Sequence, residues 1–228
     1  GGSGGTEVPI STIAAGCGSF VADPLKLTVS DRRIAVAVGI GAGIGAIFKS
    51  PLGGAMFGAE VLYSGGEIEI ETLLPAFIAS PVAYVIFASF AGFTPIFDGS
   101  VSYIFTQPAN LAFYALLGLI CGAMGRVYTT TFYTVKSFFA SLRIPKHVKP
   151  MIGLGISGMI GVFFPEILGV GYGFLQYLID GRLNLIDTNC FTAPIFVVLV
   201  LLVVFKVVAT SLTIGSGGSA GVFAPSLV

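Results

Sequence analysis

Apolar and polar residues form long blocks along this chain rather than the short alternations of a soluble protein. The apolar blocks are residues 10–21, 34–48, 52–63, 72–90, 109–142, 151–164 and 191–212. Three of them reach about 20 residues, the length that an α-helix needs to cross a bilayer. We therefore predict an all-α integral membrane protein that crosses the membrane several times.

Several blocks depart from a simple spanning helix. Residues 52–63 are too few to cross the ~30 Å hydrocarbon core in the ordinary way. Residues 109–142 would form a helix of about 50 Å, which must tilt strongly or bend. Residues 165–187 are apolar but interrupted by glycine, which indicates a re-entrant or interfacial segment. The pattern thus predicts a bundle with short, tilted and re-entrant helices.

The block at 34–48 carries glycines at positions 39, 41, 43 and 45, which form overlapping GxxxG pairs. Small residues at this spacing let the backbones of neighbouring membrane helices touch. The preceding block at 10–21, rich in glycine, alanine and serine, suits the same kind of close packing.

Composition agrees with a membrane protein. Hydrophobic residues make up 55% of the 228 residues, charged residues 10%, and the mean hydropathy is +0.97, whereas a soluble domain carries about 25% charged residues. The formal net charge is zero, which argues against a nucleic-acid partner. The chain begins without Met and stops within an apolar run, so we expect residues 1–228 to be a part of one membrane domain, cut at both ends.

Basic residues predict the orientation in the membrane. The densest basic loop holds Arg143, Lys146, His147 and Lys149, and the positive-inside rule places it in the cytoplasm. An even number of apolar blocks separates it from the polar connection at 23–33, so both are expected on the same side. The loop at 92–108, whose only charge is Asp98, is then expected outside.

Two Gly-rich stretches, residues 1–9 and 215–225, contain the same tetrapeptide, Gly2-Ser3-Gly4-Gly5 in the first and Gly215-Ser216-Gly217-Gly218 in the second. Each tetrapeptide is followed by a proline, and each stretch interrupts apolar sequence. A flexible linker is the alternative, but linkers are flanked by polar sequence. Paired Gly/Pro interruptions mark mid-membrane sites in transporters, and backbone N–H groups at helix starts suit anions. We predict an anion site where the two stretches meet near the membrane midplane.

Three ionisable residues are candidates for a functional role. Glu7 lies in the first Gly-rich stretch, where its carboxylate would compete with a bound anion and leave when protonated; the alternative is a solvated acid at a helix start. Glu60 either bonds to nearby backbone or acts in flux. Lys206, inside the strongest spanning block, either reaches an interface or attracts anions. For Glu60 and Lys206 the sequence leaves both choices open.

Enzyme chemistry is not indicated. The sequence holds no Ser/His/Asp set, no phosphate-binding loop and no cluster of metal ligands, so we expect no catalytic residue, no metal and no cofactor. Cys17, Cys121 and Cys190 are scattered and are expected to pack, and His147 is expected to be a solvated loop residue.

Three motifs resemble the CLC family of chloride channels and proton/chloride antiporters, of the bacterial or archaeal type. The motifs are Gly5-Thr6-Glu7-Val8-Pro9, similar to G(K/R)EGP; the run from Gly43 to Glu60, similar to GxxAxFxAPLxGxLFxxE; and Gly221-Val222-Phe223-Ala224-Pro225, which matches GxFxP. Their order and spacing also fit, and the resemblance covers the whole chain as roughly the middle half of the family's membrane domain.

The resemblance implies a function and a set of site residues. Chloride or a similar small anion would be the transported substrate, in a prokaryotic cell membrane. Gly5, Thr6, Glu7, Val8 and Pro9 would form the outer anion site with Glu7 as its gate. Gly221, Val222, Phe223, Ala224 and Pro225 would form the central anion site. The family fold is an inverted repeat of helices, and the protein would be a homodimer with one pore per subunit, residues 52–63 and 72–90 contributing to the interface.

Three positions depart from the family pattern. Thr6 replaces the usual basic residue and Val8 the usual glycine, so the outer site should be less positive and more crowded. Val61 stands where proton-coupled members carry an inward-facing glutamate. This favours passive or weakly proton-coupled anion transport. The alternatives are a strict proton/chloride antiporter with another inner proton route, and a structural or regulatory membrane protein that does not conduct.

Overall fold

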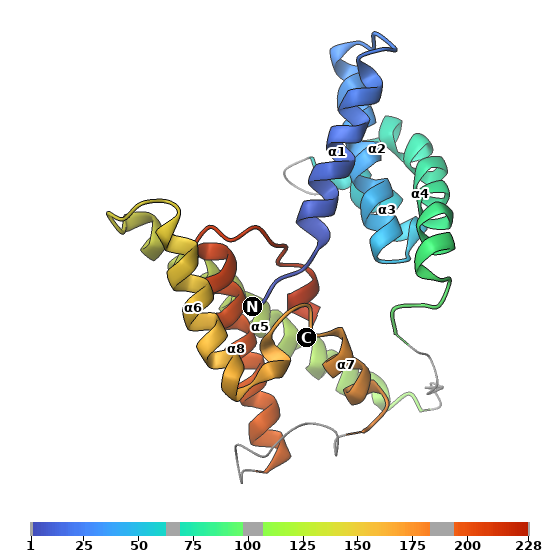
Figure 1. The fold of residues 1–228 in the computed structure, drawn as a ribbon. Coiled ribbons are helices and arrows are strands. Elements are labelled where there is room, and N and C mark those ends of the chain that lie inside the picture. The colour runs from blue at the N-terminus through green and yellow to red at the C-terminus, as the bar shows by residue number, and fades with distance from the viewer. Residues whose placement is uncertain (1, 63–68, 98–106, 183–193, 228) are drawn as a thin grey trace. The chain divides into compact units, whose positions relative to one another are not determined.

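The computed structural model of this chain describes residues 2–62, 69–97, 107–182 and 194–227 (Figure 1). Within these ranges every regular element is a helix, and the only extended pairings are two isolated backbone bridges. The chain forms two compact units, residues 6–98 and residues 1–5 with 99–228, called here the α1–α4 unit and the α5–α8 unit. The predicted all-α class is confirmed.

The α1–α4 unit is organised around α2. Its helices are α1 (Glu7–Ala22), α2 (Val29–Ile47), α3 (Pro51–Glu60) and α4 (Ile70–Ala91). Helix α2 contacts each of the other three, and α3 also packs on α4 (Figure 1). Small side chains make this possible, because α2 buries Ala37, Gly41 and Gly45 along its length.

The contact between α2 and α3 is a contact of backbones. A Cβ atom added to Gly54 of α3 would collide with the backbone of Gly45 and with the carbonyl oxygen of Gly41. One added to Gly58 would lie 2.8 Å from the carbonyl oxygen of Ala37. The close helix packing predicted from the GxxxG pattern is therefore confirmed.

Three helices begin three or more residues earlier than the hydrophobic pattern predicted. Helix α2 begins at Val29 rather than at residue 34, because the Thr28 hydroxyl caps it by accepting the Asp31 N–H at 3.2 Å. Helix α1 begins at Glu7 rather than residue 10, with Pro9 in its first turn, and α6 begins at Val148 rather than residue 151. Polar first turns hide helix starts from a purely hydrophobic reading.

The α5–α8 unit is organised around α8. Its elements are α5 (Asn110–Ser141), α6 (Val148–Phe163), the 3₁₀ turn η1 (Pro165–Ile167), α7 (Tyr172–Ile179), α8 (Ile195–Gly215) and the 3₁₀ turn η3 (Ala224–Leu227). Helix α8 contacts α5, α6 and both 3₁₀ turns. Its core contains Phe164, Ile167 and Phe174 packed on Val198, Leu202 and Ala209 of α8.

Three helices of the described residues, α4, α5 and α8, are long and apolar enough to cross a membrane. The 32 residues of α5 form one uninterrupted helix with large apolar side chains exposed along it, such as Leu111 and Leu119. At 1.5 Å per residue the helix is about 48 Å long, which exceeds the ~30 Å hydrocarbon core. A strong tilt therefore stays a prediction. Between α6 and α8, η1 and α7 take the place of the segment predicted as re-entrant; its last residues, 183–187, lie outside the described ranges, as do Tyr63, Asp98 and Cys190.

Replacing Gly54 by leucine should destabilise the α1–α4 unit, because the new side chain has to push α2 and α3 apart. Overpacking of this kind costs typically about 1–3 kcal/mol. Thermal unfolding in detergent measures the effect. The matched control is Gly16→Leu in α1, where no atom lies within 4 Å of the added Cβ; equal melting temperatures for the two variants would contradict the packing described.

Candidate functional site

The first part of the first Gly-rich stretch, Gly2–Gly5, is a short extended segment of the α5–α8 unit. It lies beside the turn that follows η1. The Gly169 N–H donates to the Gly2 carbonyl at 2.8 Å, and the Gly4 N–H donates to the Gly169 carbonyl at 3.3 Å. Gly169 has a φ of +65°, and no atom lies within 4 Å of a Cβ built there. Its backbone angle, rather than lack of space, therefore requires glycine at this turn.

The second Gly-rich stretch lies against the other side of the same segment. The Gly5 N–H donates to the Gly221 carbonyl at 2.9 Å, and the Gly221 N–H donates back to the Gly5 carbonyl at 2.8 Å. This is an isolated antiparallel bridge between two residues that both belong to the α5–α8 unit. The two stretches thus meet, as their shared tetrapeptide predicted; their depth in the membrane stays a prediction.

Ser3 fastens the extended segment to α8. Its N–H donates to the Thr213 hydroxyl at 3.1 Å, and its own hydroxyl lies 2.8 Å from that of Thr210. Thr213 in turn lies 3.4 Å from the Ser157 hydroxyl of α6. Ser3, Ser157 and Thr210 are completely buried, so these hydroxyl contacts satisfy polar groups that water does not reach.

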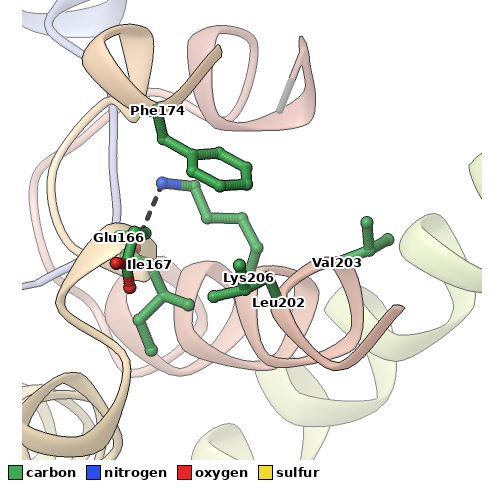
Figure 2. A pocket seen from close by; sticks show the side chains of 6 residues that line it. All are labelled: Glu166, Ile167, Phe174, Leu202, Val203 and Lys206. Atoms are coloured by element: carbon green, nitrogen blue, oxygen red, sulfur yellow. Dashed lines mark hydrogen bonds between the residues drawn. The ribbon is translucent and has the colours of Figure 1, made fainter. Parts of the chain in front are cut away.

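Lys206 bonds to the turn on which the segment Gly2–Gly5 lies. Its Nζ donates to the Ile167 carbonyl at 3.1 Å and to the Gly169 carbonyl at 3.2 Å. Figure 2 shows the ammonium directed at the end of η1, with the Phe174 ring beside the aliphatic stem. The side chain is only 3% exposed, so the alternative in which Lys206 reaches an interface is wrong: backbone carbonyls within the fold take the place of water around its charge.

A cavity of about 450 Å³ lies beside the second Gly-rich stretch within the α5–α8 unit. Helix α5 contributes one wall, α8 a second, and the residues after Gly221 a third. The lining residues are Cys121, Met124, Gly125, Tyr128, Thr129, Val203, Lys206, Val207, Val222, Phe223, Pro225 and Ser226. Two predicted anion-site residues that sit next to each other in sequence, Val222 and Phe223, therefore face one space with hydroxyl groups from α5.

Peptide groups after Gly221 share an orientation. The Val222 carbonyl accepts the Ser226 N–H at 3.2 Å, and the Phe223 carbonyl accepts the Ser226 hydroxyl at 2.6 Å. Because a trans peptide holds its N–H opposite its carbonyl, the N–H groups of Phe223 and Ala224 point away from Ser226. Ala224 and Pro225 are buried, and Phe223 is exposed.

The remaining residues of the first motif belong to the α1–α4 unit. Thr6 precedes α1 as its N-cap without a side-chain cap bond, Glu7 is its first residue, Val8 is exposed, and Pro9 lies in the first turn. The expectation that Glu7 lies inside an irregular break is corrected, since Glu7 already begins the helix. Its side chain is 5% exposed, which does not fit the alternative of a solvated acid.

Sequence reasoning missed several supporting residues. Thr210 lies four residues after Lys206 and Thr213 three residues after Thr210, so all three share one face of α8. This polar stripe in an apolar helix was the signal that the sequence offered. Nothing in the sequence marked Gly169 as a supporting residue.

The prediction for two cysteines was wrong: Cys17 and Cys121 are exposed on helix surfaces rather than packed. Glu60 ends α3 and is exposed, as is Val61.

Comparison with known proteins identifies the chain's family. The sequence model of the voltage-gated chloride channel family matches residues 1–228, the whole chain. The chain belongs to the voltage-gated chloride channel (CLC) family. The resemblance of the three motifs is thereby confirmed, and with it an all-helical integral membrane protein.

Three relatives illustrate the similarity. An uncharacterized protein of Methanocaldococcus jannaschii is 32% identical, over 100% of this chain and 54% of its own length. A putative chloride channel protein, ClcB-like, of Ralstonia nicotianae is 30% identical, over 100% and 51%. The H(+)/Cl(-) exchange transporter ClcA of Salmonella arizonae is 29% identical, over 98% and 46%. The chain therefore spans about half the length of these CLC relatives.

Replacing Gly169 by alanine should destabilise the α5–α8 unit by about 1 kcal/mol, because a Cβ is strained at positive φ. Gly169→Asn should cost less, since asparagine tolerates the left-handed region. Thermal unfolding in detergent compares them with Gly155→Ala in α6, where the added Cβ meets no atom within 4 Å. If Gly169→Ala melts no lower than Gly155→Ala, the strained turn is not needed.

Proposed function

We propose that this chain forms the anion-conducting part of a CLC-type chloride transport protein. The observation that carries the proposal is the reciprocal pair of hydrogen bonds between Gly5 and Gly221, which joins the two Gly-rich stretches at one place. Two interrupted segments that meet are the arrangement expected of a mid-membrane transport site.

The anion would be held by backbone N–H groups of both stretches. Non-helical backbone at membrane depth is tolerated where protein or a wet cavity surrounds it, and the second stretch borders a cavity with hydroxyl groups. The residues proposed for the outer site are Gly5, Thr6, Glu7, Val8 and Pro9, and those for the central site are Gly221, Val222, Phe223, Ala224 and Pro225. Chloride is the substrate, and no cofactor is required.

Glu7 is proposed as the gate. It is a buried acid in the first turn of α1, and the N-terminal end of a helix attracts negative charge of any origin. Carboxylate and chloride therefore compete for the same favourable potential. Protonation removes the carboxylate's charge and lets the anion replace it.

Transport is proposed to be passive or weakly coupled to protons. Strict exchange needs a second titratable station, and Val61 at the end of α3 binds no proton. Strict antiport through another inner proton route is the second candidate, favoured by the 29% identity to a relative named as an H(+)/Cl(-) exchange transporter. A non-conducting structural or regulatory role is a third, which anion efflux from liposomes holding the full-length protein would exclude.

We propose a homodimer in a prokaryotic lipid bilayer. Helix α4 presents Leu74, Ile78, Val82 and Val85 exposed on one face, an apolar stripe that suits a second copy or lipid. The relatives named above come from bacteria and an archaeon.

Glu7→Gln should make chloride flux less dependent on pH and raise it toward the level of the wild type at acidic pH, because glutamine resembles the protonated acid. Efflux from liposomes, measured across the pH range in which carboxylates titrate, tests this in the full-length protein.

Glu71→Gln is the matched control, since Glu71 also lies in the first turn of a helix but is exposed. It should keep the wild-type pH profile. A Glu7→Gln variant that also keeps that profile would remove Glu7 from the gate.

Under a proton gradient the reversal potential of the reconstituted full-length protein should follow chloride alone, shifting by about 59 mV per tenfold chloride gradient for a single charge. A reversal potential that moves with the pH gradient at fixed stoichiometry would favour the antiporter.

A further inference from the structure

Lys206 lines the cavity beside Val222 and Phe223, yet its ammonium donates to two backbone carbonyls of the fold. We propose that Lys206 is a positioning residue: through the turn at Gly169 it holds the segment Gly2–Gly5, and through that segment it fixes both Gly-rich stretches as one unit. The proposal rests on the function proposed above and assigns Lys206 a role in anion affinity without contact to the anion.

The first step is the pair of contacts from Lys206 to the turn. Its Nζ donates to the carbonyls of Ile167 and Gly169, and hydrogen bonds from a charged donor are stronger than neutral ones. In a side chain that is 3% exposed no water replaces a lost bond, so the turn and the ammonium stabilise each other.

The second step leads from the turn to the Gly-rich segment. Gly169 accepts from Lys206 and from Gly4 with the same carbonyl, and its N–H donates to Gly2. A shift of Gly169 therefore moves both of its partners, the carbonyl of Gly2 and the N–H of Gly4. On the opposite side Gly5 is bonded to Gly221 in both directions, which passes the constraint to the residues proposed for the central anion site.

The third step is the stripe on α8. Thr210 and Thr213 bind Ser3, the residue between the two glycines that Gly169 contacts. Lys206, Thr210 and Thr213 lie on one helix face, so one rigid element holds the segment directly at Ser3 and indirectly through the turn at Gly169. Positions fixed by a helix are more exact than positions fixed by loops.

The geometry favours this role over direct attraction of an anion. The ammonium points toward the carbonyl end of η1 (Figure 2), and Glu166 lines the same small space of about 10 Å³. The two carbonyl oxygens that accept from the ammonium weaken its field at a distance. What Lys206 transmits is therefore position.

The test uses Lys206→Met, which keeps a long apolar stem and donates no hydrogen bond, with Lys206→Arg as the conservative rescue. Chloride flux of the full-length protein in liposomes should show an apparent KM raised about tenfold in Lys206→Met, within the range of coupling between contacting residues, with a smaller change in maximal rate. Lys206→Arg should recover most of the affinity. Lys149→Met is the control, because Lys149 also donates to two backbone carbonyls, those of Phe139 and Ala140 at the end of α5.

A double-mutant cycle separates position from charge. Ser3→Ala loosens the same segment from its other contact, so it should raise the apparent KM by itself, and the double variant should be little worse than Lys206→Met. Fully additive effects would mean that Lys206 acts through its field, and an unchanged KM in both single variants would mean a role in folding alone; either result overturns the proposal. Ser3→Ala and Thr210→Val keep it testable if Lys206→Met does not fold.

Hydrogen exchange followed by mass spectrometry gives a readout that does not need transport. Lys206→Met should speed amide exchange in peptides that contain Gly2–Gly5 and Gly221, and Lys149→Met should not. If Lys206→Met speeds exchange but the wild type moves no chloride, the hydrogen-bond network is supported and the proposed function is rejected. Unchanged exchange would reject the network even if the wild type transports chloride.

Discussion

The structure of the α5–α8 unit depends on one constraint: buried backbone that leaves the helix must still find partners for its N–H and carbonyl groups. Each group left without one would cost roughly several kcal/mol. The segment Gly2–Gly5 meets the constraint by lying between Gly169 and Gly221 and bonding to both. Gly5 and Gly221 donate to each other's carbonyls, so each Gly-rich stretch supplies hydrogen-bond partners for the other.

Helix ends present the same constraint in a milder form. The last carbonyls of a helix have no partner within it, and a cation there is favourable. Three lysines of the described residues each donate to two backbone carbonyls at or just beyond a helix end. Lys49 donates to those of Gly92 and Thr94 after α4, Lys149 to those of Phe139 and Ala140 in α5, and Lys206 to those of Ile167 and Gly169 at and after the end of η1. These lysines therefore stabilise the fold by hydrogen bonds to backbone carbonyls, a role that the sequence alone does not indicate.

The two units solve packing differently. In the α1–α4 unit glycines bring α2 and α3 into backbone contact, so the interface needs almost no side-chain volume. In the α5–α8 unit larger side chains such as Phe164 and Leu202 fill the core, and Phe164 lies 4.9 Å from the Phe205 ring. The polar network that holds the Gly-rich segment, with the buried residues Ser3, Ser157, Lys206 and Thr210, lies in this second kind of interior.

The sequence by itself determined the helical membrane class, the close α2–α3 contact and the family, because hydropathy, glycine spacing and the three motifs are local properties. It also predicted that the two Gly-rich stretches meet, since both carry the same tetrapeptide. It did not determine the helix starts at Val29 and Glu7, where capping and a proline extend helices into polar sequence. It could not determine what Lys206 does, because its partners, the carbonyls of Ile167 and Gly169, are backbone atoms that no residue type reveals. Only the tertiary structure brings those carbonyls beside the ammonium, and with them the turn that receives the first Gly-rich segment.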